Sequence, residues 1–304
     1  MNKFDKSKPF FVSLGAALWA TDSLVRSQIV KDFRSTFIVF FNHLISLFIV
    51  LPLFFREWHL IKNFNYKDVL CLIFISLGGS AMATIFFTQS FALTTNYTVP
   101  VLIQKLQPII TILLAYKILK ETPAKNFWLW SILAILGAYL VSFGNQSVFG
   151  SLRSASLLPV LYAIAASFLW GASTVFGKLL LKKYSFSFVT SIRYITGTCF
   201  LFIIVLWQGQ LGDILKINNY THLLLFFIMA YIPGFLALFI YYFGLKGTKA
   251  SIATICELTF PVSAIILNWI FLDATLFPAQ IAGAVILLFS ITSLSYDNLN
   301  KLKQ

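Results

Sequence analysis

The chain has few charged residues for its length, and acidic residues are the scarcer kind. Its 304 residues include 10 Asp and Glu against 23 Lys and Arg, and only 11% of the residues are charged. A soluble domain of this length needs a far more polar surface. The composition therefore excludes an ordinary soluble protein.

Cysteine and histidine are also rare, at three residues each. Cys71, Cys199 and Cys256 form no CxxC pair, so the sequence supports neither a disulfide framework nor a zinc site. A Walker motif is absent too, which argues against ATP-driven pumping by this chain alone. We therefore expect neither a cofactor nor a metal ion. The basic residues lie mainly between apolar blocks, so we expect no nucleic-acid partner.

Apolar residues are abundant: 59% of the chain is hydrophobic, 33 residues are Phe, and the mean hydropathy is +0.86. They run in blocks of about 18–23 residues, the length at which a helix crosses a bilayer. This predicts an all-α integral membrane protein with ten transmembrane helices and short connections. The expected spans are 10–29, 35–55, 68–90, 97–119, 127–144, 157–179, 186–207, 222–243, 250–272 and 277–295.

The distribution of positive charge predicts the orientation. With the N-terminus in the cytoplasm, 16 of the 23 Lys and Arg fall on the cytoplasmic side, five fall outside, and Lys105 and Arg193 lie within spans. Positive charge is enriched in cytoplasmic loops. We therefore expect both termini in the cytoplasm, in the plasma membrane of the cell, which in a bacterium is the inner membrane.

The two halves of the sequence resemble each other. AALWATDSLV (16–25) aligns with SFLWGASTVF (167–176), and FFNHLISLFIVL (40–51) aligns with SIRYITGTCFLF (191–202). Five spans per copy is an odd number, so the second copy starts on the opposite side of the membrane. Residues 1–150 and 151–304 are thus predicted to be inverted repeats, as in many secondary transporters. The aligned pairs are Trp19 with Trp170, Asn42 and His43 with Arg193 and Tyr194, Gln104 with Glu257, and Pro108 with Pro261.

These features resemble the EamA-type permeases of the drug/metabolite transporter superfamily over nearly the whole chain. The resemblance rests on the paired LW motifs, the two spans centred on Pro108 and Pro261, and the segments KILKETP (117–123) and FLDAT (271–275). The small-residue segments ILAILGAYLVSFG (132–144) and AQIAGAVILLFS (279–290) fit the last helix of each repeat. The resemblance implies two intertwined five-helix units around a central cavity, and a transport function.

Ionisable side chains inside the spans are the first candidates for a substrate site, because a charge there costs at least about 2.5–3.5 kcal/mol on insertion scales. Lys105 and Glu257 are expected near the midplane, in equivalent spans. They either bind substrate or form a buried ion pair that orders the helices. Arg193 either binds a carboxylate or phosphate through its planar fork or pairs with Glu257.

Other polar residues share this depth. Gln104 and Gln107 are three residues apart, so they share a helix face and can hydrogen-bond either a substrate or a neighbouring helix. Asn42 and His43 are the counterparts of Arg193, and His43 is either a proton carrier or a hydrogen-bonded neutral imidazole. Pro108 and Pro261 are expected to kink their helices.

Aromatic and charged residues of the first and sixth spans complete the candidates. Trp19 and Trp170 lie within spans, where they either pack or form an aromatic wall of the cavity. Asp22 and Arg26 are spaced for an i, i+4 ion pair, which either forms an outer gate or stabilises a helix end.

The sequence thus predicts a secondary transporter that moves a small organic solute by alternating access, and no enzymatic activity. Charges of both signs in the site favour a zwitterionic or anionic metabolite, such as an amino acid or a nucleotide-like compound. Protons or a counter-substrate are the candidate coupling partners. The alternatives are a membrane-embedded enzyme that acts on lipids, or a membrane assembly protein that transports nothing.

Overall fold

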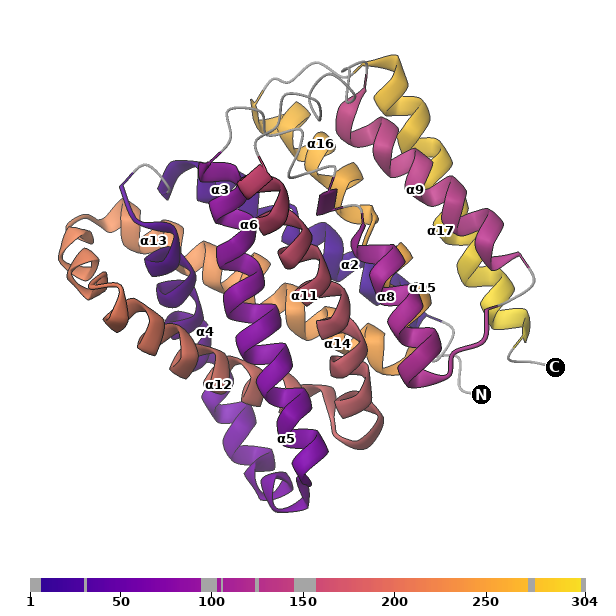
Figure 1. The fold of residues 1–304 in the computed structure, drawn as a ribbon. Coiled ribbons are helices and arrows are strands. Elements are labelled where there is room, and N and C mark those ends of the chain that lie inside the picture. Colours follow the sequence, from indigo (N-terminus) through magenta and orange to yellow (C-terminus); the bar gives the residue numbers. More distant parts are fainter. Residues whose placement is uncertain are drawn as a thin grey trace.

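In a computed structural model of the protein, residues 7–29, 32–93, 103–104, 106–123, 126–144, 157–272 and 277–301 are described. Throughout these residues the regular structure is helical (Figure 1). Lys105 and residues 273–276, which include part of FLDAT, fall outside the described residues.

The helices of the first half lie largely within the expected spans, although two of those spans are interrupted. Hydrogen-bonding side chains mark where several begin: Asn65 accepts from Asp68 in a reciprocal capping box at the start of α5, for example. The segments η2 and η3 are π-helical, and η1 is a 3-10 helix. The elements are α2 (Lys8–Trp19), α3 (Asp22–Ile29), α4 (Ser35–Glu57), η1 (Trp58–Asn63), α5 (Tyr66–Ile73), η2 (Phe74–Met82), α6 (Ala83–Ala92), α8 (Gln107–Leu114), η3 (Ala115–Leu119) and α9 (Phe127–Phe143).

The second half shows a similar order of helices. Ser185 caps the start of its second helix and Asn219 the start of the helix after η4. A 3-10 helix, η4, again follows the second helix, and a π-helical segment, η5, again interrupts the third. The elements are α11 (Leu157–Lys183), α12 (Phe186–Trp207), η4 (Leu211–Lys216), α13 (Tyr220–Met229), η5 (Ala230–Leu236), α14 (Ala237–Gly247), α15 (Ala250–Cys256), α16 (Thr259–Leu272) and α17 (Pro278–Lys301).

Within the described residues, six helical stretches are long and apolar enough to cross a bilayer. Three shorter apolar helices accompany them: Gln107–Leu119, Phe127–Phe143 and Pro278–Leu294. Many large apolar side chains also point outward, as lipid-facing residues do; Ile203 and Val285, for example, are more than three-fifths exposed. The protein is therefore an all-helical integral membrane protein.

The expected first span, 10–29, is not one continuous helix. α2 ends at Trp19 and α3 starts at Asp22, with Ala20 and Thr21 in a turn between them. The Thr21 hydroxyl donates to the carbonyl oxygen of Leu18, which satisfies one acceptor at the end of α2. An acidic residue in the first turn of a helix is favourable, so Asp22 stabilises the new start.

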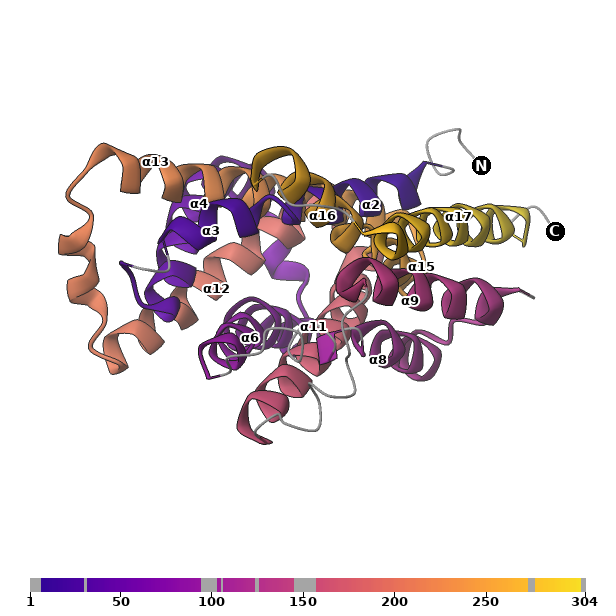
Figure 2. The ribbon, with the colours of Figure 1, turned by 90° about the horizontal axis from the view of Figure 1, so that it is seen from above.

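Helices from the two halves pack against one another in a crossed pattern. α2 lies along α14, and α6 lies along α11. α4 packs on α12, and α9 on α17, the last pair forming one edge of the molecule (Figures 1 and 2). Each of these four contacts joins the first half to the second, so neither half is packed as a separate domain.

Glycines allow two of these contacts to be close. A Cβ on Gly137 would lie 2.8 Å from the carbonyl oxygen of Gly283, and a Cβ on Gly283 would lie 2.8 Å from that of Gly137. In the α2–α14 contact, a Cβ on Gly244 would lie 2.6 Å from the backbone nitrogen of Val12. Small residues at such crossings let backbones approach, as is common between membrane helices.

Ion pairs join the chain near the ends of α4 and α12. The Arg34 guanidinium holds Asp213 through Nε and Nη2, at 2.9 and 3.0 Å, and Lys216 approaches the same carboxylate at 3.0 Å. The hydrogen bond from Arg34 lowers the pKa of the buried Asp213 carboxyl to about 2. At the other ends of these helices, Lys183 and Tyr184 both donate to Asp68. A carboxylate buried beside a basic residue thus lies near each end of the α4–α12 pair; Asp68 itself belongs to α5 and Lys183 to α11.

We predict that Gly137→Ala and Gly283→Ala each destabilise the protein by about 1–3 kcal/mol, the usual cost of overpacking. The added methyl group would overlap backbone atoms of the facing helix, which cannot move aside as a flexible side chain can. The apparent melting temperature in detergent measures the effect. Gly212→Ala is the control, because no atom lies within 4 Å of a Cβ there. Equal melting temperatures for all three variants would contradict the close α9–α17 contact.

Candidate functional site

Glu257 lies at a break in the ninth expected span. α15 ends at Cys256, Glu257 and Leu258 form a turn, and α16 begins at Thr259. Pro261 falls in the first turn of α16, where its missing N–H costs no helical hydrogen bond. The proline thus follows a break instead of kinking one continuous helix, and the break frees the Glu257 side chain from a regular helix face.

A second break lies in the fourth expected span. Residues 103–104 are helical, Leu106 lies in a turn, and α8 starts at Gln107 with Pro108 in its first turn. Gln104 lies half-buried just before this turn. α8 packs on α11 at Gly171, where the Thr111 hydroxyl donates to the Gly171 carbonyl oxygen at 3.2 Å. Discontinuous helices of this kind form the substrate sites of many transporters.

The two breaks meet at the Glu257 carboxylate. Gln107 donates from Nε2 to Oε2 at 2.8 Å, and the Tyr241 hydroxyl donates to Oε1 at 2.6 Å. Both donors are neutral, and no Lys, Arg or His of the described residues forms an ion pair with this carboxylate. We name Glu257, Gln107, Tyr241, Thr174 and Trp19 the acidic cluster.

The remaining two members of the acidic cluster surround Tyr241. Thr174 of α11 lies 3.2 Å from the Tyr241 hydroxyl oxygen, and Trp19 of α2 packs on the Tyr241 ring at a centroid distance of 4.9 Å. Trp19, Gln107 and Glu257 are each half-buried, whereas Thr174 and Tyr241 are buried. Polar groups from α8, α11, α14 and the α15–α16 turn therefore converge beside one aromatic face.

Arg193 of α12 is the centre of a second group. Its Nε donates to the Ser80 hydroxyl at 2.8 Å, Nη1 donates to the Tyr242 hydroxyl, and the guanidinium carbon lies 5.5 Å from the centre of the Tyr242 ring. Ser173 of α11 lies close by, because a Cβ on Gly79 would meet both its hydroxyl and Arg193 Nη2. We name Arg193, Ser80, Ser173 and Tyr242 the basic cluster.

Trp170 borders the basic cluster from α11. Its indole Nε1 donates to the carbonyl oxygen of Gly79 at 3.1 Å, and its ring packs edge-on against Phe87 at 5.1 Å between centroids. Each cluster therefore has one tryptophan beside it, Trp19 or Trp170, from the aligned positions of the two halves.

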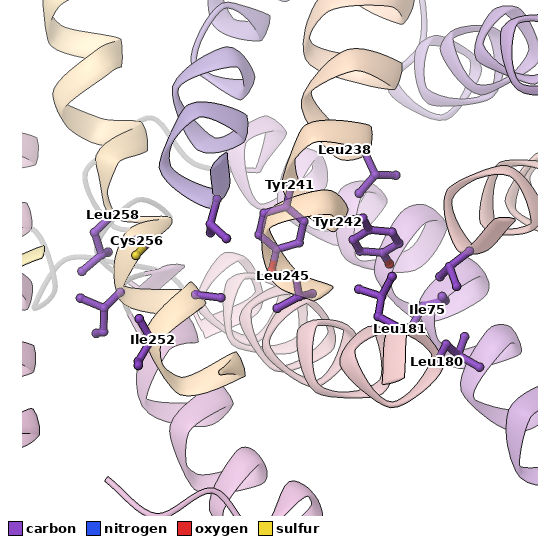
Figure 3. Close-up of a cluster of buried hydrophobic side chains, with 14 of the residues drawn as sticks. Ile75, Leu180, Leu181, Leu238, Tyr241, Tyr242, Leu245, Ile252, Cys256 and Leu258 are labelled. Carbon is purple, nitrogen blue, oxygen red and sulfur yellow. The ribbon is translucent and has the colours of Figure 1, made fainter. Parts of the chain in front are cut away.

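The two clusters meet through neighbouring residues of α14. Figure 3 shows Tyr241 on the side of α14 that faces Cys256 and Leu258, the residues on either side of Glu257, and Tyr242 on the side of Leu181. The tyrosine rings are 5.8 Å apart between centroids. Arg193 and Glu257 thus hydrogen-bond adjacent tyrosines, but within the described chain they form no ion pair with each other.

Other candidate residues lie outside these clusters. His43 packs on Tyr194 at 5.3 Å between ring centroids, and its Nδ1 lies 2.9 Å from the Val39 carbonyl oxygen. Asn42 is buried beside Gly234. Asp22 and Arg26 pair with each other along α3, so the i, i+4 geometry is present. A gating role for that pair and a proton-carrying role for His43 stay predictions.

Sequence reasoning missed the other residues of the two clusters: Tyr241, Tyr242, Thr174, Ser80 and Ser173. The adjacent tyrosines in IYYFG (240–244) are the one signal that could have identified some of them. A phenol within an apolar span needs a hydrogen-bond partner inside the protein. The hydroxyls of Ser and Thr give no comparable signal, because they can bond to their own helix backbone.

Glu121, at the end of the fourth span, binds the start of α15, the helix that leads to Glu257. Its carboxylate accepts from the backbone nitrogens of Ala250 and Ser251 at 2.8 and 3.0 Å, and from the Ser251 hydroxyl at 2.7 Å. It therefore caps the start of α15, whose last residue precedes Glu257. The seven residues of α15 are all buried, so this short helix is fixed at the end opposite the acidic cluster.

The helices are apolar on the outside, and they enclose two polar clusters and two broken spans. This combination is typical of polytopic membrane transporters. The model of the EamA-like transporter family matches residues 7–143 and again residues 157–296. The chain belongs to the EamA-like transporter family, which fits the drug/metabolite transporter superfamily. It is accordingly a permease and not an enzyme.

Curated relatives are named transporters. The riboflavin transporter ImpX of Fusobacterium nucleatum subsp. nucleatum is 35% identical over 291 residues, which cover 94% of this chain and 97% of that protein. An uncharacterized transporter of Methanothermobacter thermautotrophicus is 31% identical over 144 residues, 47% of this chain and 41% of its own length. One solved structure superposes over the whole of both chains with a TM-score of 0.78, at 13% identity, and supports the fold alone.

We predict that Glu121→Gln lowers the free energy of unfolding by about 1–2 kcal/mol, a usual cost of losing a helix N-cap. The glutamine side chain has the same shape as glutamate but lacks the negative charge that favours a helix start. Its NH2 group would face the N–H donors of Ala250 or Ser251, which it cannot accept from. Melting in detergent measures the effect. Glu57→Gln is the matched control, since Glu57 accepts one bond, from Ser185 at 2.7 Å. A loss no larger than in this control would show that the cap contributes little.

Proposed function

We propose that the protein is a secondary transporter that moves a small organic solute by alternating access, with the acidic cluster as part of the solute site. The observation that carries the proposal is the Glu257 carboxylate, which lies at a break in an apolar helix bundle and, among the described residues, accepts from the neutral donors Gln107 and Tyr241. A carboxylate within a membrane protein is costly, so such a site favours a solute that supplies hydrogen-bond donors or positive charge.

In this proposal the membrane domain has ten transmembrane helices in two inverted repeats, residues 1–150 and 151–304, around a central cavity. The crossed packing supports the arrangement: the first helix of each half lies along the third of the other, as in α2–α14 and α11–α6. Matching positions of the 3-10 and π-helical segments support it further. So does the pairing of equivalent helices, α4 with α12 and α9 with α17.

Riboflavin is the first candidate for the solute. Support comes from the relative named a riboflavin transporter, which matches nearly the whole of both chains at 35% identity. The acidic cluster suits a flat ring with a polar edge, because it combines the Trp19 face with the Gln107 amide and the Glu257 carboxylate. Amino acids and nucleotide-like compounds are the competing solutes, because a site with both Glu257 and Arg193 also suits them.

We further propose that both termini lie in the cytoplasm, and that in a bacterial cell the protein lies in the inner membrane. The start of α2 and the end of α17 lie on the same side of the molecule in both views, which supports an even number of spans (Figures 1 and 2). Protons or a counter-substrate drive the cycle in this proposal. Glu257 and His43 are the titratable side chains that could carry a proton.

Uptake of labelled riboflavin into liposomes that contain the purified protein tests the proposal. Glu257→Gln is expected to reduce uptake at least tenfold, about 1.4 kcal/mol. The amide removes the charge and directs an NH2 group at the donors of Gln107 or Tyr241. Gln107→Leu should reduce uptake in the same direction, whereas Gln208→Leu, in an exposed turn, should not.

The two parts of the proposal fail separately. Wild-type uptake of riboflavin with unchanged uptake in folded Glu257→Gln and Gln107→Leu proteins would overturn the site. No uptake of riboflavin by the wild type, together with stabilisation by an amino acid or nucleotide in a thermal-shift screen, would overturn the flavin assignment and leave a transporter for that compound.

A further inference from the structure

The guanidinium of Arg193 has more N–H donors than partners among the described residues, and it lies within a membrane helix, where an unpaired charge is costly. An arginine side chain carries five N–H donors. Among the described residues, its guanidinium donates to two neutral hydroxyls, on Ser80 and Tyr242, and no carboxylate lies at ion-pair distance. A cation deep in a membrane helix usually pairs with an anion or faces a functional site. Within the described part of the chain, the basic cluster therefore contains no negative charge to balance its arginine.

Ser173 gives an independent indication at the same place. Its side chain is only 3% exposed, and its hydroxyl has no hydrogen-bond partner among the described residues. Buried hydroxyls are nearly always bonded, so one that is not requires an explanation. A Cβ on Gly79 would overlap this hydroxyl and would lie 3.3 Å from Arg193 Nη2, so the absence of a side chain at Gly79 lets both groups approach.

These donors lie beside aromatic surface and near the acidic cluster. Trp170 is bonded to the carbonyl oxygen of Gly79 itself, and the adjacent Tyr241 and Tyr242 connect the two clusters. A solute held by the acidic cluster therefore has the donors of the basic cluster on the other side of these two adjacent tyrosines.

We propose that Arg193, Ser173 and Ser80 form a subsite for an oxyanion carried by the solute. The inference rests on the proposed function, and it extends the substrate class from a neutral flavin to flavins that carry a phosphate. A phosphate accepts several hydrogen bonds and matches the planar fork of arginine. It would supply both the charge that Arg193 lacks and an acceptor for the Ser173 hydroxyl.

Competition against uptake of labelled riboflavin tests the subsite with a matched pair of probes. Unlabelled riboflavin and riboflavin 5′-phosphate differ only in the phosphate. With wild-type protein the phosphate ester is expected to inhibit at least as well as riboflavin. With Arg193→Gln its half-inhibitory concentration should rise at least tenfold, while that of riboflavin changes less than threefold. Arg56→Gln, at an exposed position at the end of α4, should change neither value.

A second variant tests the subsite independently, in case Arg193→Gln does not fold. Ser173→Ala removes only the unpartnered hydroxyl, and it should weaken inhibition by the phosphate ester about threefold to tenfold and leave riboflavin unaffected. Riboflavin uptake by the wild type without inhibition by the ester, or equal shifts for both probes in the variants, would overturn the subsite alone. If neither flavin is taken up or bound by the wild type, the flavin assignment and the subsite are both overturned.

Discussion

The fold depends on one constraint: inside the bilayer, polar groups must find their partners within the protein. The Glu257 carboxylate is the severest instance, because it lies at the end of a broken helix in an apolar bundle. Among the described residues, its hydrogen bonds come from different halves of the chain, Gln107 from the first and Tyr241 from the second. The acidic cluster therefore exists only when both halves are packed together, and α15 must hold Glu257 where these donors can reach it.

The same constraint explains the short helices and the way they end. A break in a membrane helix leaves backbone groups without partners, and such breaks are tolerated only where other parts of the protein or water supply them. At the start of α15, Glu121 supplies three acceptor contacts from the other half. At its end, the Ser13 hydroxyl donates to the Cys256 carbonyl oxygen. Side chains from the first half thus satisfy both ends of α15.

Much of the helix pattern could be predicted from the sequence, because apolar runs of span length are a strong and local signal. The breaks could not. The turn at Ala20 and Thr21 contains no proline or glycine of its own, and the prolines at 108 and 261 indicated a kink where the structure has a helix start. Hydropathy measures burial in lipid and does not record which backbone hydrogen bonds are made.

The candidate site was predicted in part. Charged residues are rare within the spans, and this rarity identified Glu257 and Arg193, which both lie in polar clusters. Lys105, identified in the same way, lies outside the described residues. Tyr241, Tyr242 and Ser80, which hydrogen-bond Glu257 or Arg193, were not foreseen, because partner choice depends on how the two halves cross. The sequence of a single span does not show which helix of the other half it packs against. Trp19 and Trp170, at aligned positions of the two halves, each contact one of the clusters or its border, at Tyr241 and at Gly79.

The central claim is that both halves move around one solute site that opens to each side of the membrane in turn. Counterflow in liposomes tests this most directly. Loading the liposomes with unlabelled riboflavin should accelerate the entry of labelled riboflavin and cause its transient accumulation, because the site returns occupied. Entry of labelled riboflavin at the same rate and to the same level in loaded and empty liposomes would contradict alternating access.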